Sequence, residues 1–144
     1  MKAKDFLNQY YNAKRKTSLL DRELNLLKET EGDIRATDYG RIIVDGTRNP
    51  DTIGNFLAQL EDKRDELLRA KLEAHKMQHR VLSVITRLED PLLNELLFAR
   101  FIDLKEWEDI ANEMAYSLRN IHYMKDRAYA EVEKILKEDK WKTN

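Results

Sequence analysis

Two histidines are the residues of this sequence that could most readily bind a metal. His75 and His79 stand four positions apart, a spacing that places both imidazoles on one face of a helix. A third ligand would have to come from Glu73 or Glu89, whose spacing from the pair is poor, and the chain contains no cysteine. We therefore expect two solvated histidines, with no metal site and no cofactor.

A group of acidic residues forms the other candidate for chemistry. It consists of Glu106, Glu108, Asp109 and Glu113. Carboxylates can act as general acid and base, but no nucleophile or glycine-rich phosphate loop accompanies these four. A solvated helix face is the favoured interpretation. The sequence therefore does not predict an enzyme.

Size and composition predict a small helical protein. A chain of 144 residues can form one compact domain or two small sub-domains. Charged residues make up 37% of it, against four glycines and two prolines, a balance typical of long solvated helices. No apolar run approaches the roughly 20 residues that span a bilayer, so we expect an all-α, cytoplasmic protein. Because the net charge is -1, any affinity for DNA must come from a local patch, from dimerisation or from a partner.

The N-terminal part has the apolar spacing of two long helices. The first seam alternates intervals of four and three residues: Phe6, Tyr10, Ala13, Thr17, Leu20, Leu24 and Leu27. The second seam follows Pro50: Ile53, Leu57, Leu60, Leu67, Ala74, Val81 and Leu88. Between them, glycines punctuate the segment from Thr30 to Asn49, which predicts a connecting loop with a short extended stretch at Ile42–Val44. Residues 1–88 are therefore expected to form an antiparallel, coiled-coil-like helical hairpin.

The second predicted helix is longer than the first and carries long polar side chains beside its seam. Arg64, Lys71 and Gln78 follow each other at intervals of seven residues. Such positions can specify a partner helix, so the hairpin is a candidate for homodimerisation or partner binding. The alternative is a monomer in which these side chains extend along the edge of the hairpin.

Residues 89–144 have the spacing of a helix-turn-helix. Three short apolar faces follow one another: Leu92, Leu93, Leu96, Leu97, Phe101 and Ile102; then Trp107, Ile110, Ala111 and Met114; then Ile121, Met124, Ala128, Val132 and Ile135. Ser117 is a good N-cap for the third helix, and Ala111 is small enough for a close helix crossing. A helix projected by a short turn can enter a major groove. A plain helical bundle is the alternative.

Three stretches of this part resemble a known family. Leu96–Ile102, Lys105–Ala111 and Tyr116–His122 are similar to the fourth conserved region of bacterial sigma factors. The tryptophan before Glu108-Asp109-Ile110-Ala111 and the tyrosine before Ser117 make the sequence more similar still to the ArpU-type and RinA-type regulators of Gram-positive phages. Those regulators also resemble this chain in having a helical hairpin ahead of the motif.

The resemblance implies a DNA-binding transcription regulator, an activator of phage late genes that acts on double-stranded promoter DNA with host RNA polymerase in the bacterial cytoplasm. It implies groove-facing positions at Leu118, Arg119, Asn120, His122 and Tyr123, with Ser117, Lys125 and Arg127 nearer the phosphates. Arginine can read guanine, asparagine can read adenine, and an apolar side chain can meet a thymine methyl group. No segment resembles the sigma region that melts promoters, so a complete sigma factor is not expected.

Three further interpretations remain open at this point. The acidic group around Glu108 could meet a basic surface on polymerase. Trp107 is expected to anchor the core among Leu97, Ile110 and Ile121, with base stacking as the alternative. For the whole chain, the competing functions are a small terminase subunit, which would form rings, and a coiled-coil adaptor that does not bind DNA.

Overall fold

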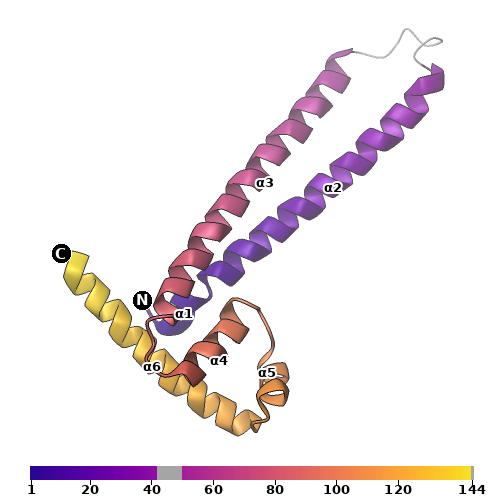
Figure 1. The fold of residues 1–144 in the computed structure, drawn as a ribbon. Coiled ribbons are helices and arrows are strands. Elements are labelled where there is room, and N and C mark those ends of the chain that lie inside the picture. The colour runs from indigo at the N-terminus through magenta and orange to yellow at the C-terminus, as the bar shows by residue number, and fades with distance from the viewer. Residues whose placement is uncertain (42–49, 144) are drawn as a thin grey trace. The chain divides into compact units, whose positions relative to one another are not determined.

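The computed structural model describes residues 1–41 and 50–143, and the regular secondary structure of these residues is entirely helical (Figure 1). Within this part of the chain the helices are α1 (Ala3–Leu7), α2 (Gln9–Arg41), α3 (Pro50–Ile85), α4 (Pro91–Phe101), α5 (Trp107–Met114) and α6 (Leu118–Thr143). The all-α class is thus confirmed. None of these helices combines the length and the apolar character that a membrane span requires.

The helices belong to two compact units. Unit 1 comprises Met1–Lys14 together with Glu73–Asn144, and unit 2 comprises Arg15–Leu72. This division differs from the expected boundary between residues 88 and 89. The start of α2 and the end of α3 belong to the same unit as α4, α5 and α6, because their apolar residues share one core with those helices.

In unit 2, α2 and α3 lie side by side around a narrow core (Figure 1). Leu24 of α2 is buried with Leu60 and Leu67 of α3, and Leu20 and Leu27 pack against them. These leucines are members of the two predicted seams. An ion pair of 2.8 Å between Lys63 Nζ and Glu23 Oε2 also joins the two helices. The apolar spacing therefore identified the residues that hold this unit together.

The predicted loop from Thr30 to Asn49 is wrong over its first part, because α2 continues to Arg41. Thr30 Oγ1 donates a hydrogen bond to the carbonyl of Leu26, and Arg35 pairs with Glu31 one turn earlier, both of which are intrahelical contacts. Gly32 does not end the helix; a Cβ added there would meet no atom within 4 Å. The predicted extended stretch Ile42–Val44 lies outside the described residues.

Unit 1 has a single core, built mostly from residues that the predicted apolar faces contained. Its completely buried side chains include Leu7, Val81, Ile85, Leu96, Leu97, Ile110, Ile121 and Val132. Helix α6 contacts α1, α4 and α5, and the backbone N–H of Ala3 donates to Glu133 Oε1 at 3.4 Å. The short helix α1 is therefore packed on α6, a contact that the sequence did not predict.

Candidate nucleic-acid interface

A three-residue turn joins α5 to α6 and fixes where α6 begins. Ala115 has a left-handed backbone (φ 59°, ψ 37°), and the N–H of Tyr116 donates to the carbonyl of Ala111 at 3.0 Å. Ser117 Oγ then accepts a hydrogen bond from the N–H of Asn120 at 3.1 Å. The predicted N-cap at Ser117 is confirmed. Capping leaves the first turn of α6 regular and its outer side chains exposed.

One face of α6 is buried against α4 and α5. Ile121, Met124, Ala128, Val132 and Ile135 follow helical spacing and are all buried, as predicted. Ala111 on α5 is buried as well, at 5% exposure, consistent with the small residue expected where the two helices cross. This packing holds α6 rigidly and turns its opposite face outward.

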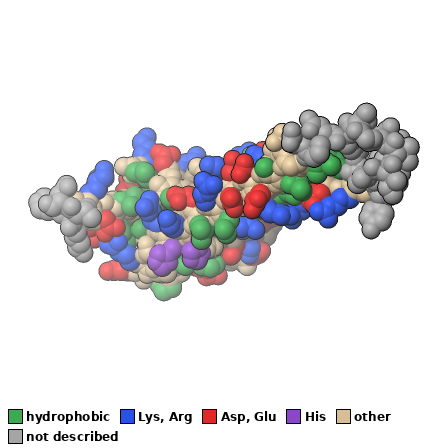
Figure 2. Space-filling model, turned by 90° about the horizontal axis from the view of Figure 1, so that it is seen from above, with side chains coloured by type: hydrophobic (Ala, Val, Ile, Leu, Met, Phe, Trp, Pro, Cys, Tyr) green, Lys and Arg blue, Asp and Glu red, His purple; other side chains and the backbone are tan. Residues whose placement is uncertain are grey.

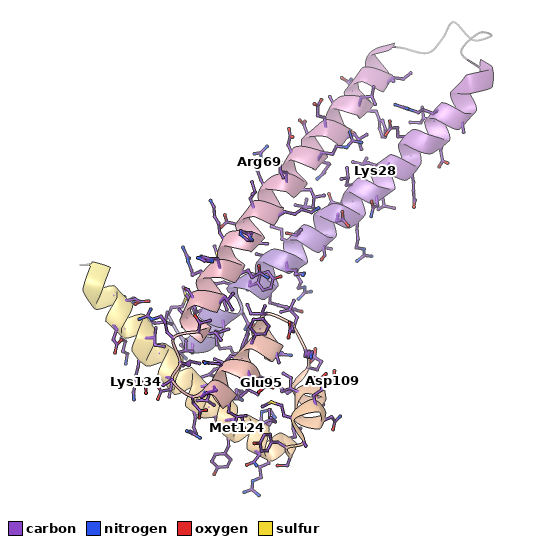
Figure 3. All side chains as sticks on the ribbon, in the orientation of Figure 1. Lys28, Arg69, Glu95, Asp109, Met124 and Lys134 are labelled. Carbon is purple, nitrogen blue, oxygen red and sulfur yellow. The ribbon has the colours of Figure 1, made fainter. Side chains whose placement is uncertain are left out.

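The outward face at the start of α6 contains six of the eight predicted site residues. The exposed ones are Ser117, Leu118, Arg119, Asn120, Tyr123 and Arg127. Two of them are apolar or aromatic: Leu118 is 39% exposed and Tyr123 is 66% exposed. Figure 3 shows side chains at this end of α6 projecting away from α4. We call these six exposed residues the ridge of α6. Its arginines, amide and apolar groups provide the donors and surfaces that base edges require.

Asp126 is a further residue of this face that the sequence interpretation missed. It lies in a shallow hollow with Leu118, Arg119, His122 and Tyr123. Its position three residues after Tyr123 and seven after Arg119 places it on the same ridge, and this spacing was visible in the sequence. A carboxylate there would repel phosphate but can accept a hydrogen bond from a cytosine amino group.

The remaining two predicted residues, His122 and Lys125, are half-buried on one flank of the ridge. The His122 ring lies 6.2 Å from the Trp107 ring, and its Nδ1 atom is buried without a hydrogen-bond partner among the described residues. Lys125 Nζ lies 3.8 Å from Asp126 Oδ1 and 5.9 Å from the centre of the Tyr129 ring. Burial raises the pKa of the Tyr129 phenol.

Arg127 and Asn120 occupy the other flank, because seven residues are close to two helical turns. Arg127 Nη2 lies 3.8 Å from Asp90 Oδ2, while 68% of its side chain is exposed. Asp90 also caps α4, where its Oδ1 accepts from the N–H of Leu92 at 2.9 Å. The guanidinium of Arg127 is thus held loosely beside Asn120 and remains accessible to an anion such as phosphate.

Trp107 is less buried than the sequence suggested. Its ring packs edge-on against Phe101, at 6.3 Å between centroids, and lies near His122. Arg100 covers part of the indole, with its Cζ atom 5.2 Å from the ring centre. The residue is half-buried at the first position of α5. Through His122, Trp107 packs against α6.

Replacement of Trp107 by alanine should lower the free energy of unfolding by about 2 kcal/mol, less than a fully buried tryptophan would lose. The reason is that Trp107 is only half-buried, although its ring packs on Phe101 and His122. Urea unfolding followed by far-ultraviolet circular dichroism measures this difference. A loss below about 0.5 kcal/mol would contradict the packing described here.

The other chemistry-bearing residues are exposed. His75 and His79 lie on the solvent side of α3, and the described residues contain no cluster of three metal-ligating side chains. Glu106, Glu108, Asp109 and Glu113 are all exposed, as the solvated-face interpretation predicted. Figure 2 shows acidic and basic side chains interspersed over one face of the molecule, so no large field of one sign covers that face.

Comparison with protein-family models, with curated proteins and with solved structures finds no match to this chain.

Proposed function

We propose that this protein is a sequence-specific DNA-binding transcription regulator in which α5, the turn and α6 form a helix-turn-helix. The observation that carries the proposal is the exposed ridge at the start of α6, where Arg119, Asn120 and Tyr123 project from a capped and firmly packed helix. The first helical turns of a recognition helix are the part that reaches base edges in the major groove.

The geometry around the ridge supports this assignment. The connection between α5 and α6 has only three residues, with the left-handed backbone of Ala115 redirecting the chain. The ridge offers an arginine, an amide, apolar groups and a flanking arginine. These are the side-chain types that read bases and hold phosphates.

The sequence resemblance adds a role for the proposed activity. Regulators of the ArpU and RinA type suggest promoter DNA as the target, activation of late phage genes as the outcome, and host RNA polymerase as a partner. Helices α2 and α3 would then form a helical hairpin that serves self-association or partner binding. The buried leucines that α2 and α3 share in unit 2 are consistent with such a hairpin.

Arg119→Glu, which reverses the charge of this side chain, should weaken binding to duplex DNA about tenfold, because the arginine lies on the proposed contact ridge. Fluorescence anisotropy of a labelled duplex pool, enriched from random sequence by the wild type, measures the affinity. Arg69→Glu on α3 makes the same change in net charge at an exposed position of unit 2 and is the matched control. Equal losses in the two variants would contradict the assignment of α6.

A further inference from the structure

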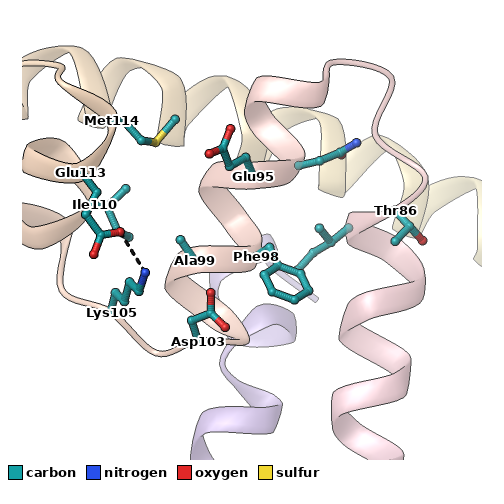
Figure 4. A pocket seen from close by; sticks show the side chains of 11 residues that line it. Thr86, Glu95, Phe98, Ala99, Asp103, Lys105, Ile110, Glu113 and Met114 are labelled. Carbon is teal, nitrogen blue, oxygen red and sulfur yellow. Dashed lines mark hydrogen bonds and ion pairs between the residues drawn. The ribbon is translucent and has the colours of Figure 1, made fainter.

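A groove in unit 1 lies away from the ridge of α6. Its walls come from the end of α3, from α4, from α5 and from the connection between α4 and α5, and its volume is about 570 Å³ (Figure 4). The ridge residues of α6 do not line it. It therefore offers a second surface on the unit that carries the proposed DNA-binding face.

The groove has an apolar floor that remains open to solvent. Phe98 is 40% exposed, and the half-buried Ala99 and Met114 line the same groove. Ile110, which is 1% exposed, also contributes to the lining. Covering a concave apolar surface of this kind with a ligand removes apolar area from water, which favours binding. Aromatic side chains in such pockets are common anchor residues of protein interfaces.

The rim of the groove is acidic. Glu95, Asp103 and Glu113 contribute carboxylates, and Lys105 is the single cationic residue of the lining. Lys105 Nζ is engaged with Glu113 Oε2 at 2.8 Å, as the dashed line in Figure 4 shows, and this hydrogen bond raises the pKa of Lys105. The carboxylates of Glu95 and Asp103 therefore dominate the remaining charge, which disfavours nucleic acid and favours a cationic ligand.

We propose that this groove binds a basic amphipathic helix of a partner protein. The apolar face of that helix would cover Phe98 and Met114, and lysines or arginines at its edges would meet Glu95 and Asp103. An amphipathic helix in an apolar groove is a recurring mode of peptide recognition, and the charge of the rim selects the basic kind. The site goes beyond DNA binding: it gives the same unit a face for protein that is separate from its face for DNA.

The test uses the full chain and three synthetic, fluorescein-labelled peptides of about 16 residues. One is an amphipathic helix with leucines at helical spacing and lysines elsewhere; the second has glutamate in place of lysine; the third has the composition of the first in a scrambled order without an apolar face. We expect the first to bind at least tenfold more tightly than the other two. Equal binding of the first and third would overturn the proposal, because charge alone would then explain it.

Variants locate the site. Phe98→Ser and the double variant Glu95→Lys/Asp103→Lys should each weaken binding of the basic amphipathic peptide at least fivefold. Glu108→Lys/Asp109→Lys is the matched control for the double charge reversal, since both residues are exposed on α5 but do not line the groove. An equal loss in this control would overturn the assignment.

Methyl resonances give a second location that does not depend on substitution. The methyl signals of Met114 and Ala99 in the wild type should shift on titration with the basic amphipathic peptide, and largest shifts elsewhere would contradict the groove. The titrations contain no DNA, so the groove is tested independently of the proposed DNA binding.

Discussion

Truncation of Leu7 to alanine should lower the free energy of unfolding of unit 1 by about 3 kcal/mol. Leu7 is completely buried, and α1, which contains it, packs on α6. The loss has two parts, the transfer of the leucine side chain and the cavity that remains in a core which cannot close around it. An effect of this size from residue 7 on helices near the C-terminus follows only if the two ends of the chain share one core.

Fluorescence of Trp107 in a Trp141→Phe background reports the unfolding of the region around α5, and the Leu7 variant is compared with the parent in urea. Leu19→Ala is the matched control, because Leu19 is 56% exposed on α2 and should change stability by less than about 0.5 kcal/mol. If the Trp107 transition kept its midpoint in Leu7→Ala, residues 89–144 would be an independent domain, as the sequence first suggested.

The helices themselves were largely predictable, because apolar spacing and capping residues carry local information. Helices α4, α5 and α6 contain the three predicted apolar faces except Ile102, which is the C-cap of α4, and Ser117 caps α6 as expected. The start of α3 at Pro50 also agrees with the prediction. The end of α2 was misplaced because Gly32 was interpreted as a helix breaker. A single glycine costs a helix only about 1 kcal/mol, which the surrounding helix formers can offset.

The division into units could not be predicted from the same information. Phe6, Tyr10, Ala74 and Val81 fit a heptad seam whether their partner is the other arm of the hairpin or a third helix. Periodicity identifies which face is buried but does not identify what buries it. In the structure these four residues share a core with α4, α5 and α6. A boundary drawn where the pattern changes, at residue 88, therefore separates residues that pack together.

The candidate site was predictable in outline and less so in detail. Arg119, Asn120 and Tyr123 are exposed, as a reading face requires, because the buried positions of α6 were identified correctly. His122 is half-buried beside Trp107, which lies on α5, whereas Lys125 is half-buried beside Tyr129, one turn further along α6. Asp126 was not among the predicted site residues, although its spacing from Arg119 places it on the same face of α6.

We propose that α6 reads DNA sequence, and Asn120 and Arg127 test this proposal best because they share a flank of the ridge. Asn120→Ala should reduce the free energy of binding to an enriched duplex by about 1 to 3 kcal/mol and should change binding to a scrambled duplex little. The reason is that a bidentate contact to adenine carries sequence information. Arg127→Ala should weaken both duplexes alike and reduce the salt dependence of binding by about one unit of slope, since one fewer counterion is released.

The most direct measurement is the ratio of affinities for the enriched and scrambled duplexes, determined for the wild type, Asn120→Ala and Arg127→Ala at several salt concentrations. We expect this ratio to fall about fivefold or more in Asn120→Ala and to stay constant in Arg127→Ala. An unchanged ratio in Asn120→Ala, together with loss of the preference for the enriched duplex on substitution in unit 2, would show that α6 does not read the sequence and would assign that role to α2 and α3.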